Sequence, residues 1–345
     1  MKKSTLTLLL IATFGLTACS EQKINEWACG YEMGQTRCNN LIVKAGENKE
    51  YDKARKYLEI SANYGNPKMQ AALGISYQTG ELGHEKDYQK ALYWLQKSAE
   101  QGNAAGQREL GLLYENGFIV QQDYDKALEL YKKSAEQGDM SAQTDLGRMY
   151  ANGNGVQQDY VQAVEWYRKS AEQGYAEAQV ILGKMYKDGK GVQQDEIQAN
   201  QWFTKAINHY QQTAKQGYAY AQFRLGRMYE NGWGVEKDYA LALQWYQKAA
   251  EQKHPEAQFA IGSLYDDGLG VEQDYVIAFQ WYEKAANQEF ATAQTAIGLM
   301  YENGDGVEKN LTKAQEYYEK GCRNGSHGGC DNLELIQKKL ITYEK

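Results

Sequence analysis

The stretch AQTDLGRMYANGNGVQQDYVQAVEWYRKSAEQG, residues 142–174, contains the pattern that decides the fold of this 345-residue chain. Its segment LGRMY, residues 146–150, occurs seven times in related form. The seven copies begin at Leu73, Leu110, Leu146, Leu182, Leu225, Ile261 and Ile297. The steps between them are 37, 36, 36, 43, 36 and 36 residues. A fixed period of this length is typical of stacked helical repeats, which present an extended surface to their partners.

Each repeat is predicted to form two antiparallel helices joined by a glycine-rich turn. One face of the first helix carries Ala142, Leu146, Gly147 and Tyr150. These positions follow the 3.6-residue period of an amphipathic helix. Asp159 is a favoured N-cap for the second helix, and Gly174 is expected to end it in a left-handed conformation. The sequence therefore predicts an all-α protein.

A glycine lies inside every predicted first helix, although it costs about 1 kcal/mol relative to alanine there. The glycines are Gly74, Gly111, Gly147, Gly183, Gly226, Gly262 and Gly298. We expect the neighbouring helix to approach closely, with its Ala, Trp and Tyr side chains packing where another side chain would stand. By the same reasoning, core packing is assigned to the tryptophans of the second helices. These are Trp94, Trp166, Trp202, Trp245 and Trp281.

The step of 43 residues contains a seven-residue surplus, residues 207–213. Seven residues are nearly two helical turns, so the insertion lengthens a second helix and nearly preserves its buried face. A protruding helix end after Trp202 is predicted rather than a break in the stack. The segment is either a functional spur or a tolerated insertion.

Residues 1–18 have the features of a secretion signal. Two lysines precede an apolar run at residues 6–16, which is too short to span a bilayer. The tetrapeptide LTAC, residues 16–19, resembles the lipobox of bacterial lipoproteins, which implies that Cys19 becomes the lipid-modified first residue. An ordinary signal peptide cleaved near Cys19 is the alternative. Ser20, where an aspartate would favour the inner membrane, implies the outer membrane.

The net charge limits the possible partners, and the cysteine count indicates the compartment. Removing Lys2 and Lys3 with the signal leaves 36 basic residues against 45 acidic ones, a net charge near −9. Such a charge argues against nucleic acid as a partner. With Cys19 set aside, the remaining cysteines form two close pairs, which suggests two disulfides in the oxidising periplasm. The pairs are Cys29 with Cys38 and Cys322 with Cys330.

The full pattern of residues 142–174 resembles the Sel-one-like repeat (SLR), a relative of the tetratricopeptide repeat. The resemblance covers residues 51–325 and implies a right-handed α/α superhelical solenoid of helix pairs. Departures are local: residues 118–119 replace the second loop glycine, the loop at residues 80–83 is one residue longer, and Glu196 replaces the usual tyrosine.

The predicted organisation has four parts. They are a lipoprotein signal peptide at 1–18, a lipid tether with a disulfide-stapled cap at 19–50, the repeat solenoid at 51–325 and a capping helix at 326–345. An amphipathic pattern supports the last part, with Leu333, Ile336, Leu340 and Tyr343 on one face.

The terminal cysteine pairs resemble those of the secreted, cysteine-rich branch of this family. There, a disulfide staples a second helix to the next first helix. Aligning Cys330 with Gln143 places one glutamine of each repeat at the joints between helix pairs, so the series is interpreted as structural. It comprises Gln70, Gln107, Gln143, Gln179, Gln222, Gln258 and Gln294.

In tetratricopeptide relatives the first helices line a concave groove, which implies that the residue after each helix glycine faces it. Arg148, Lys184 and Arg227 hold this position in the central repeats. Neighbouring candidates are Arg108, Arg224, Tyr220, Phe223, Asn152 and Asn231. Arginine suits bidentate carboxylate recognition, so a carboxylate-bearing protein or peptide segment is the predicted partner.

Two alternatives stay open for this groove. The basic residues could instead be ordinary solvated positions paired with Glu115, Asp145, Asp188 or Glu230. Trp233, the one tryptophan in a loop between the helix patterns, is either a binding residue on the rim or a cover for a neighbouring turn.

The sequence contains little that suggests catalysis. The four histidines are scattered, no metal motif occurs, and no cofactor is predicted. The one S-x-x-K motif, Ser20 to Lys23, lies in the tether. Proteins of the cysteine-rich branch have been classed as weak β-lactamases or penicillin binders, which makes that activity the leading enzyme alternative. The internal repeats here, however, lack cysteine pairs.

Together these features predict a non-catalytic scaffold or adaptor of the bacterial cell envelope. The expected protein is lipid-anchored at the outer membrane, faces the periplasm and binds an envelope protein or peptide segment in its groove. A purely structural or host-facing surface protein is a third interpretation.

Overall fold

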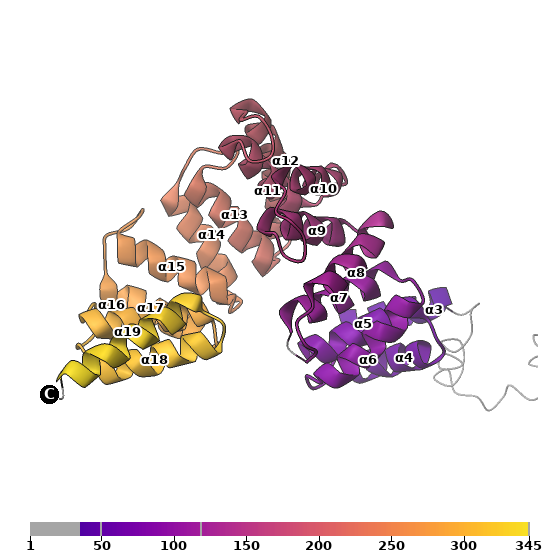
Figure 1. The fold of residues 1–345 in the computed structure, drawn as a ribbon, viewed down its shortest axis with the longest axis horizontal. Helices are drawn as coiled ribbons and strands as arrows, with labels where there is room; N and C mark the ends of the chain where they lie inside the picture. Colours follow the sequence, from indigo (N-terminus) through magenta and orange to yellow (C-terminus); the bar gives the residue numbers. More distant parts are fainter. Residues whose placement is uncertain (1–34, 49, 118, 344–345) are drawn as a thin grey trace, which may run out of the picture. The chain divides into compact units, whose positions relative to one another are not determined.

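The computed structural model describes residues 35–48, 50–117 and 119–343, and within them it contains α-helices and no β-strand (Figure 1). The first helices of the repeats are α5 (Pro67–Thr79), α7 (Ala104–Asn116), α9 (Met140–Asn152), α11 (Ala176–Asp188), α13 (Ala219–Asn231), α15 (Pro255–Asp267) and α17 (Ala291–Asn303). The second helices are α4 (Tyr51–Asn63), α6 (Tyr88–Glu100), α8 (Tyr124–Glu136), α10 (Tyr160–Glu172), α12 (Glu196–Lys215), α14 (Tyr239–Glu251), α16 (Tyr275–Ala286) and α18 (Leu311–Arg323). Two further helices, α3 (Gln35–Glu47) and α19 (His327–Tyr343), flank them.

The chain divides into two compact units, with the boundary between Gln173 and Gly174. The first unit contains α3 to α10, and the second contains α11 to α19. Within each unit, consecutive helices pack side by side in tandem. This arrangement confirms the predicted all-α helical-repeat solenoid. The boundary was not predicted from the sequence, in which the repeats continue across it. The predicted signal peptide, Cys19 and Cys29 lie outside the described residues.

The helix boundaries follow from the capping residues that the sequence contains. Asp159 caps α10, because its carboxylate accepts hydrogen bonds from the backbone amides of Val161 and Gln162, at 2.9 and 3.0 Å. Its own amide donates to the Tyr150 carbonyl at 2.9 Å, which ties the start of α10 to the end of α9. Gly174 has φ +95°, the predicted left-handed conformation.

The helix glycines are points of close contact between first and second helices. A Cβ on Gly226 would lie 2.5 Å from Tyr246 Cε1, and one on Gly147 would lie 2.9 Å from Tyr167 Cδ1. The predicted close approach is therefore confirmed, but the residue responsible is the aromatic that follows the tryptophan rather than the tryptophan itself. Leu95 and Phe203 take this role in two repeats.

The tryptophans of the second helices precede these contact residues in sequence, and a lysine side chain lies over each indole ring. Trp202 is buried, and Trp166 is partly buried against the core formed by Tyr131, Leu146 and Met149. A lysine three residues later lies over each indole, with Lys169 Nζ 3.9 Å from the Trp166 ring centroid. The other pairs are Lys97 with Trp94, Lys205 with Trp202, Lys248 with Trp245 and Lys284 with Trp281. These contacts bear out the predicted packing role.

The glutamine series forms a ladder of buried hydrogen bonds between consecutive helices. Gln143 Nε2 donates to the Ala135 carbonyl at 3.1 Å, and Gln143 Oε1 accepts from Gln173 Nε2 at 2.8 Å. Gln143 thus links α8, α9 and the end of α10. Gln70, Gln222 and Gln294 make both kinds of bond, and all seven glutamines are buried. The structural interpretation of the series is confirmed.

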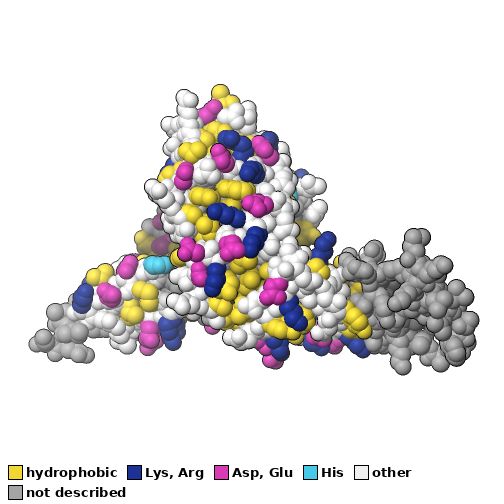
Figure 2. Space-filling view, turned by 45° about the vertical axis from the view of Figure 1, so that its right-hand side comes forward, with side chains coloured by type: hydrophobic (Ala, Val, Ile, Leu, Met, Phe, Trp, Pro, Cys, Tyr) yellow, Lys and Arg dark blue, Asp and Glu magenta, His cyan; other side chains and the backbone are white. Residues whose placement is uncertain are grey.

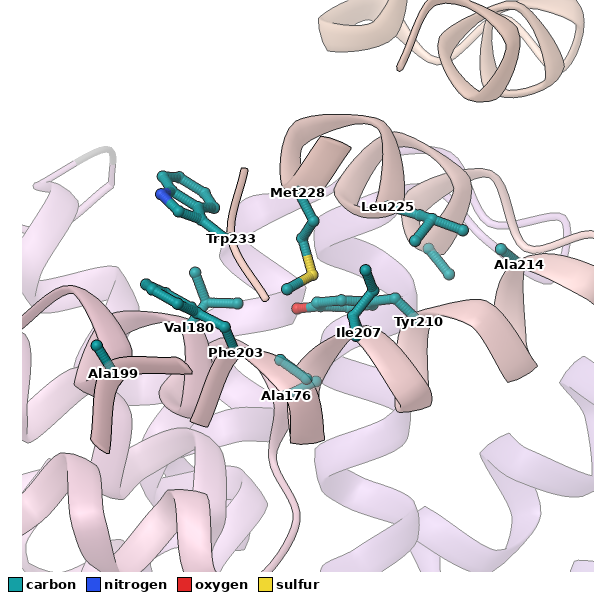
Figure 3. Close-up of a cluster of buried hydrophobic side chains, with 12 residues drawn as sticks. Ala176, Val180, Ala199, Phe203, Ile207, Tyr210, Ala214, Leu225, Met228 and Trp233 are labelled. Atoms are coloured by element: carbon teal, nitrogen blue, oxygen red, sulfur yellow. The ribbon is translucent and has the colours of Figure 1, made fainter. Parts of the chain in front are cut away.

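The seven-residue insertion extends α12 without breaking it. This helix has 20 residues, where most of the others have 13. Ile207 and Tyr210, both within the insertion, are buried in the core that α12 shares with α11 and α13 (Figure 3). The insertion therefore contributes packing residues to the second unit.

The two ends of the chain differ in how far the structure describes them. Cys322 and Cys330 form the predicted disulfide between α18 and α19, with their Cα atoms 4.5 Å apart. Ile336 of the predicted capping helix is completely buried against Ala314 and Tyr318. In α3, Cys38 is completely buried beside Tyr57, whereas its predicted partner Cys29 lies outside the described residues.

We expect Gly226→Ala to lower the free energy of unfolding by about 1 to 3 kcal/mol, because the new methyl group overlaps the Tyr246 ring. Urea denaturation followed by circular dichroism measures this change. Gly328→Ala, in α19, is the matched control, since nothing lies within 4 Å of the added Cβ. Equal stability of the Gly226→Ala variant and the wild type would contradict the proposed helix contact.

Candidate functional site

The predicted groove residues belong to two units and are described within each. Arg108, Arg148 and Asn152 lie in the first unit. Lys184, Tyr220, Phe223, Arg224, Arg227 and Asn231 lie in the second. On the face shown in Figure 2, basic side chains lie among acidic ones, with hydrophobic side chains between them. The contacts of each cation therefore decide whether it is available to a partner.

In the first unit, Arg148 is held by a buried carboxylate. Both terminal nitrogens of its guanidinium donate to Glu115, and the Nη2 to Oε2 distance is 2.7 Å. Tyr131 donates its hydroxyl to the same Glu115 oxygen at 2.7 Å. Arg148 also contacts Asp145 at 3.3 Å. This cluster links α7, α8 and α9, so Arg148 has a structural role.

Arg108 is also paired within the first unit. Its Nε donates to Asp145 Oδ2 at 2.8 Å, and its Nη1 donates to Glu109 Oε1 at 2.6 Å. Burial raises the pKa of the Glu109 carboxyl, although the Arg108 charge opposes this shift. For Arg108 and Arg148 the alternative of intramolecular pairing therefore holds, with two of the predicted partners, Glu115 and Asp145.

In the second unit, Glu177 of α11 gathers three donors. Arg224 Nη2 lies 2.8 Å from Glu177 Oε2, and Tyr220 donates its hydroxyl to the same oxygen at 2.9 Å. Tyr210, from the insertion in α12, donates to it at 3.3 Å. Burial raises the pKa of both tyrosines, which remain neutral donors. Glu177 and Tyr210 were not predicted from the sequence.

Lys184 differs from the arginines because its contact is aromatic. Its Nζ lies 3.9 Å from the centroid of the Trp233 ring, a cation–π geometry. No ion pair among the described residues of the second unit involves Lys184, whereas Arg224 and Arg227 each have one. Burial lowers the pKa of the Lys184 amine, the charges of Arg224 and Arg227 lower it further, and the charges of Glu177 and Asp188 oppose this shift. Lys184 is therefore a partly buried cation that is not bonded to a described carboxylate of its own unit.

Arg227 is the most exposed of the three basic residues predicted to line the groove in the second unit. Its side chain is 44% exposed, and its Nε lies 3.4 Å from Glu230 Oε2. That carboxylate also accepts the Tyr246 hydroxyl at 2.6 Å. Asn231 donates its side-chain amide to the Arg227 carbonyl at 2.8 Å, so this donor is turned toward its own helix. Asn152 is exposed on the first unit.

Two aromatic residues of the second unit, Phe223 and Trp233, are buried. Phe223 was expected to add exposed aromatic surface, but it is only 9% exposed, because it packs against Leu243 and Tyr246. Trp233 is likewise 9% exposed, and its ring stacks on Phe203 with a centroid distance of 5.9 Å (Figure 3). Trp233 thus covers the hydrophobic core, and its ring also contacts the Lys184 amine.

The residue four positions after each helix glycine gives a sequence signal for the difference between Arg148, which has a buried carboxylate partner, and Lys184, which has none among the described residues of its unit. Four repeats have an acid there that accepts the second-helix tyrosine hydroxyl: Glu115, Glu230, Asp266 and Glu302. The equivalent positions in the two central repeats are Ala151 and Lys187. Arg148 pairs with the acid of the preceding repeat. Lys184 and Arg227 each follow a repeat in which this acid is missing; the first repeat, with Gln78 at this position, is the third that lacks it.

One constellation has the connectivity of a nucleophilic triad. Ser76 Oγ lies 2.7 Å from His84 Nδ1, and His84 Nε2 lies 3.2 Å from Glu59 Oε1. Ser76 is only 3% exposed, however, and its hydroxyl also donates to the Glu81 carbonyl at 2.8 Å. The three residues therefore fix the longer loop after α5. Within the described part of the chain, no group of three potential His, Cys, Asp or Glu ligands could hold a metal ion.

We expect Glu115→Gln to destabilise the protein at neutral pH by about 1 to 3 kcal/mol, because the buried Arg148 contact loses its charge. Burial acts to raise the pKa of Glu115, but hydrogen bonds from Arg148 and Tyr131 and the Arg148 charge hold it below its usual value. The stabilisation is therefore complete above the ordinary glutamate pKa, about 4.3. It is lost as the pH falls through the lower pKa of the folded state.

Thermal unfolding of both proteins from neutral to acidic pH measures this difference. The gap between wild type and Glu115→Gln should narrow on acidification. Glu136→Gln, at an exposed position of α8, is the control and should leave the pH dependence unchanged. A gap that stays constant over the whole range would show that the Glu115 charge is not the stabilising feature.

Comparison with known proteins identifies the repeat. The Sel1 repeat matches residues 43–66, 67–103, 104–139, 141–175, 176–210, 204–218, 219–254, 255–290 and 291–326. No curated protein sequence matches the chain.

Solved structures with the same repeat are similar to this chain. A Sel1 repeat protein from Oxalobacter formigenes is 33% identical, with 73% of this chain and 96% of that one covered and a TM-score of 0.50. A protective antigen of uropathogenic Escherichia coli with an SLR fold is 36% identical over 82% of this chain, with a TM-score of 0.44. The chain spans 59% of that antigen's length. These matches show that the chain belongs to the Sel1 repeat family.

Proposed function

We propose that this protein is a non-catalytic scaffold of the bacterial cell envelope that binds a carboxylate-bearing segment of another envelope protein. Sel1 repeat proteins are typically protein-interaction scaffolds. The proposed binding surface is the face of α11 and α13 that carries Lys184, Arg224 and Arg227, here called the basic face.

The observation that carries this proposal is the contrast between Arg148 and Lys184. Arg148 is neutralised by a buried glutamate, whereas Lys184 lies on an aromatic ring and has no ion pair among the described residues of the second unit. Removing charge from water without a counterion is costly, so a carboxylate supplied by a partner would be stabilised at Lys184. The exposed Arg227 guanidinium, which has one contact of 3.4 Å with Glu230, offers further donors to the same carboxylate. The surface is small and the whole chain is acidic, which favours a local protein contact over binding to a polyanion.

The envelope location is proposed from the N-terminal sequence, which lies outside the described residues. We propose that residues 1–18 are a signal peptide, that Cys19 carries the lipid, and that the protein faces the periplasm from the outer membrane. The Cys322–Cys330 disulfide supports an oxidising compartment. No helix in the described ranges is both long enough and apolar enough to cross a membrane.

Crosslinking in intact cells tests the binding surface. We expect wild-type protein to capture an envelope protein that the double variant Lys184→Glu and Arg227→Glu loses, because the basic face then repels a carboxylate. The matched control is Lys190→Glu with Lys215→Glu, which changes the net charge equally at two exposed positions of the same unit. Equal abundance and equal circular dichroism spectra must be established first.

Capture that is unchanged in the Lys184 and Arg227 variant would refute the basic face as the binding surface. Capture of no envelope protein by the wild type would count against the scaffold function itself.

The anchor is tested separately. We expect Cys19→Ala to move the protein from the membrane fraction to the soluble fraction and to abolish labelling by a fatty-acid analogue, because the acylated cysteine is then absent. Fractionation and mass spectrometry of the mature N-terminus measure both effects. Soluble wild-type protein, or an unmodified mature N-terminus, would contradict lipid attachment.

A further inference from the structure

The basic face is chemically divided along α13. Tyr220, Arg224 and Arg227 follow one another at helical spacing on the same side of this helix. Arg224 is engaged by Glu177, so its charge is already compensated. The more exposed residues on this side are Tyr220, which is 51% exposed, and Arg227, whose Nε has a longer contact of 3.4 Å with Glu230. One end of the face is therefore aromatic and the other is basic.

The aromatic end is extended by a histidine from the next repeat. The His254 ring stacks on Phe223 with a centroid distance of 5.0 Å, and it lies 6.4 Å from the Tyr220 ring. Burial lowers the pKa of His254, while the nearby Glu256 opposes this shift. The His254 and Tyr220 rings form an aromatic platform at the start of α13, with the Glu256 carboxylate 3.2 Å from His254 Nδ1. Glu177 is hydrogen-bonded to Tyr220 and does not add a second open charge there.

The basic end combines Arg227 with Lys184. Lys184 is on α11, where its position after the helix glycine is equivalent to that of Arg227 on α13. Lys187, exposed on α11, occupies the place where other repeats have an acid. Tyr220 and Arg227 are seven residues apart, which is about 10 Å along a helix at 1.5 Å per residue.

We infer that the basic face selects a protein segment in which an apolar side chain and a carboxylate are three residues apart. A polyproline II segment has three residues per turn and rises about 3.1 Å per residue. Residues i and i+3 of such a segment point to the same side and lie about 9 Å apart, close to the spacing of the two ends of the face. The apolar side chain rests on Tyr220 and His254, and the carboxylate binds Lys184 and Arg227.

This inference rests on the proposed function, because it specifies the segment that the same surface binds. A segment with both features explains why the face joins the exposed Tyr220 to Lys184, a cation with no ion pair among the described residues of the second unit. A nucleic acid or a membrane surface would use both the ring and the cations, so the charge of the rest of the chain is what disfavours them. The acidic remainder of the chain opposes binding to an extended polyanion.

Fluorescence anisotropy with the full chain and labelled twelve-residue peptides tests the spacing. Each peptide carries one Trp and one Glu in a Pro-rich host, with an amidated C-terminus. The Glu is placed one, three or six residues after the Trp. We expect the peptide with the spacing of three to bind at least tenfold more tightly than the other two. Replacing its Glu by Gln should remove most of the binding.

Variants assign each end of the peptide. Lys184→Gln and Arg227→Gln should each weaken binding of the Glu peptide several-fold and leave the weaker Gln peptide unaffected. Tyr220→Ala should remove the preference for Trp over Ala, and Tyr220→Phe should retain it because the ring remains. Lys215→Gln and Tyr275→Ala are controls at exposed positions of the same unit. Circular dichroism and thermal unfolding establish that each variant is folded.

The outcomes separate this inference from the proposed function. If acidic peptides bind through Lys184 and Arg227 regardless of spacing, the selection of spacing is wrong and the scaffold function stands. If no acidic peptide binds, or the charge variants bind normally, both proposals fail. Binding to vesicles of anionic phosphatidylglycerol that depends on Lys184, without binding to any peptide, would replace the protein segment by a lipid surface.

Discussion

The contact between a glycine of each first helix and a large side chain of the second helix, aromatic in every repeat but the first, is the constraint on which the rest of the structure depends. At Gly226, Gly262 and Gly298 an added Cβ would lie only 2.5 to 2.6 Å from the facing tyrosine ring. Such a distance excludes any side chain larger than hydrogen without a shift of the helices. The close approach also brings the tyrosine hydroxyl to the acid four residues after the glycine, as in the pair Tyr246 and Glu230.

That secondary effect contributes to the pairing of a cation that directly follows a helix glycine. Where the second helix has tyrosine and the first helix has an acid, the carboxylate is fixed beside the groove positions, and Glu115 in this way holds Arg148. Phe203 has no hydroxyl, and Lys187 stands at the acid position of the same repeat. A change in the packing pair thus coincides with a change in the charge of the surface. The basic face therefore lies where individual repeats depart from the shared pair of a tyrosine and an acid.

Much of the fold could be predicted because it depends on regular spacing. The helix pairs, the Asp159 cap, the glutamine ladder and the Cys322–Cys330 bridge all occupy fixed positions in a repeated pattern. The surface was harder to predict, because exposure and pairing depend on contacts between repeats. Phe223 lies four residues before the exposed Arg227 on the same helix, yet packing against Tyr246 buries Phe223. The division after Gln173 leaves no break in the pattern, so the sequence does not reveal it.

The insertion in α12 shows how a departure from the repeat can alter a surface without forming a new element. It adds Tyr210, whose hydroxyl bonds to Glu177, and the Arg224 guanidinium lies 5.8 Å from the Tyr210 ring. Glu177 is thereby committed to Arg224 and two tyrosines rather than to Lys184. Lys184 is left with the Trp233 ring as its contact and has no ion pair among the described residues of the second unit. The inserted turns therefore stabilise the core and also preserve the charge that a partner would meet.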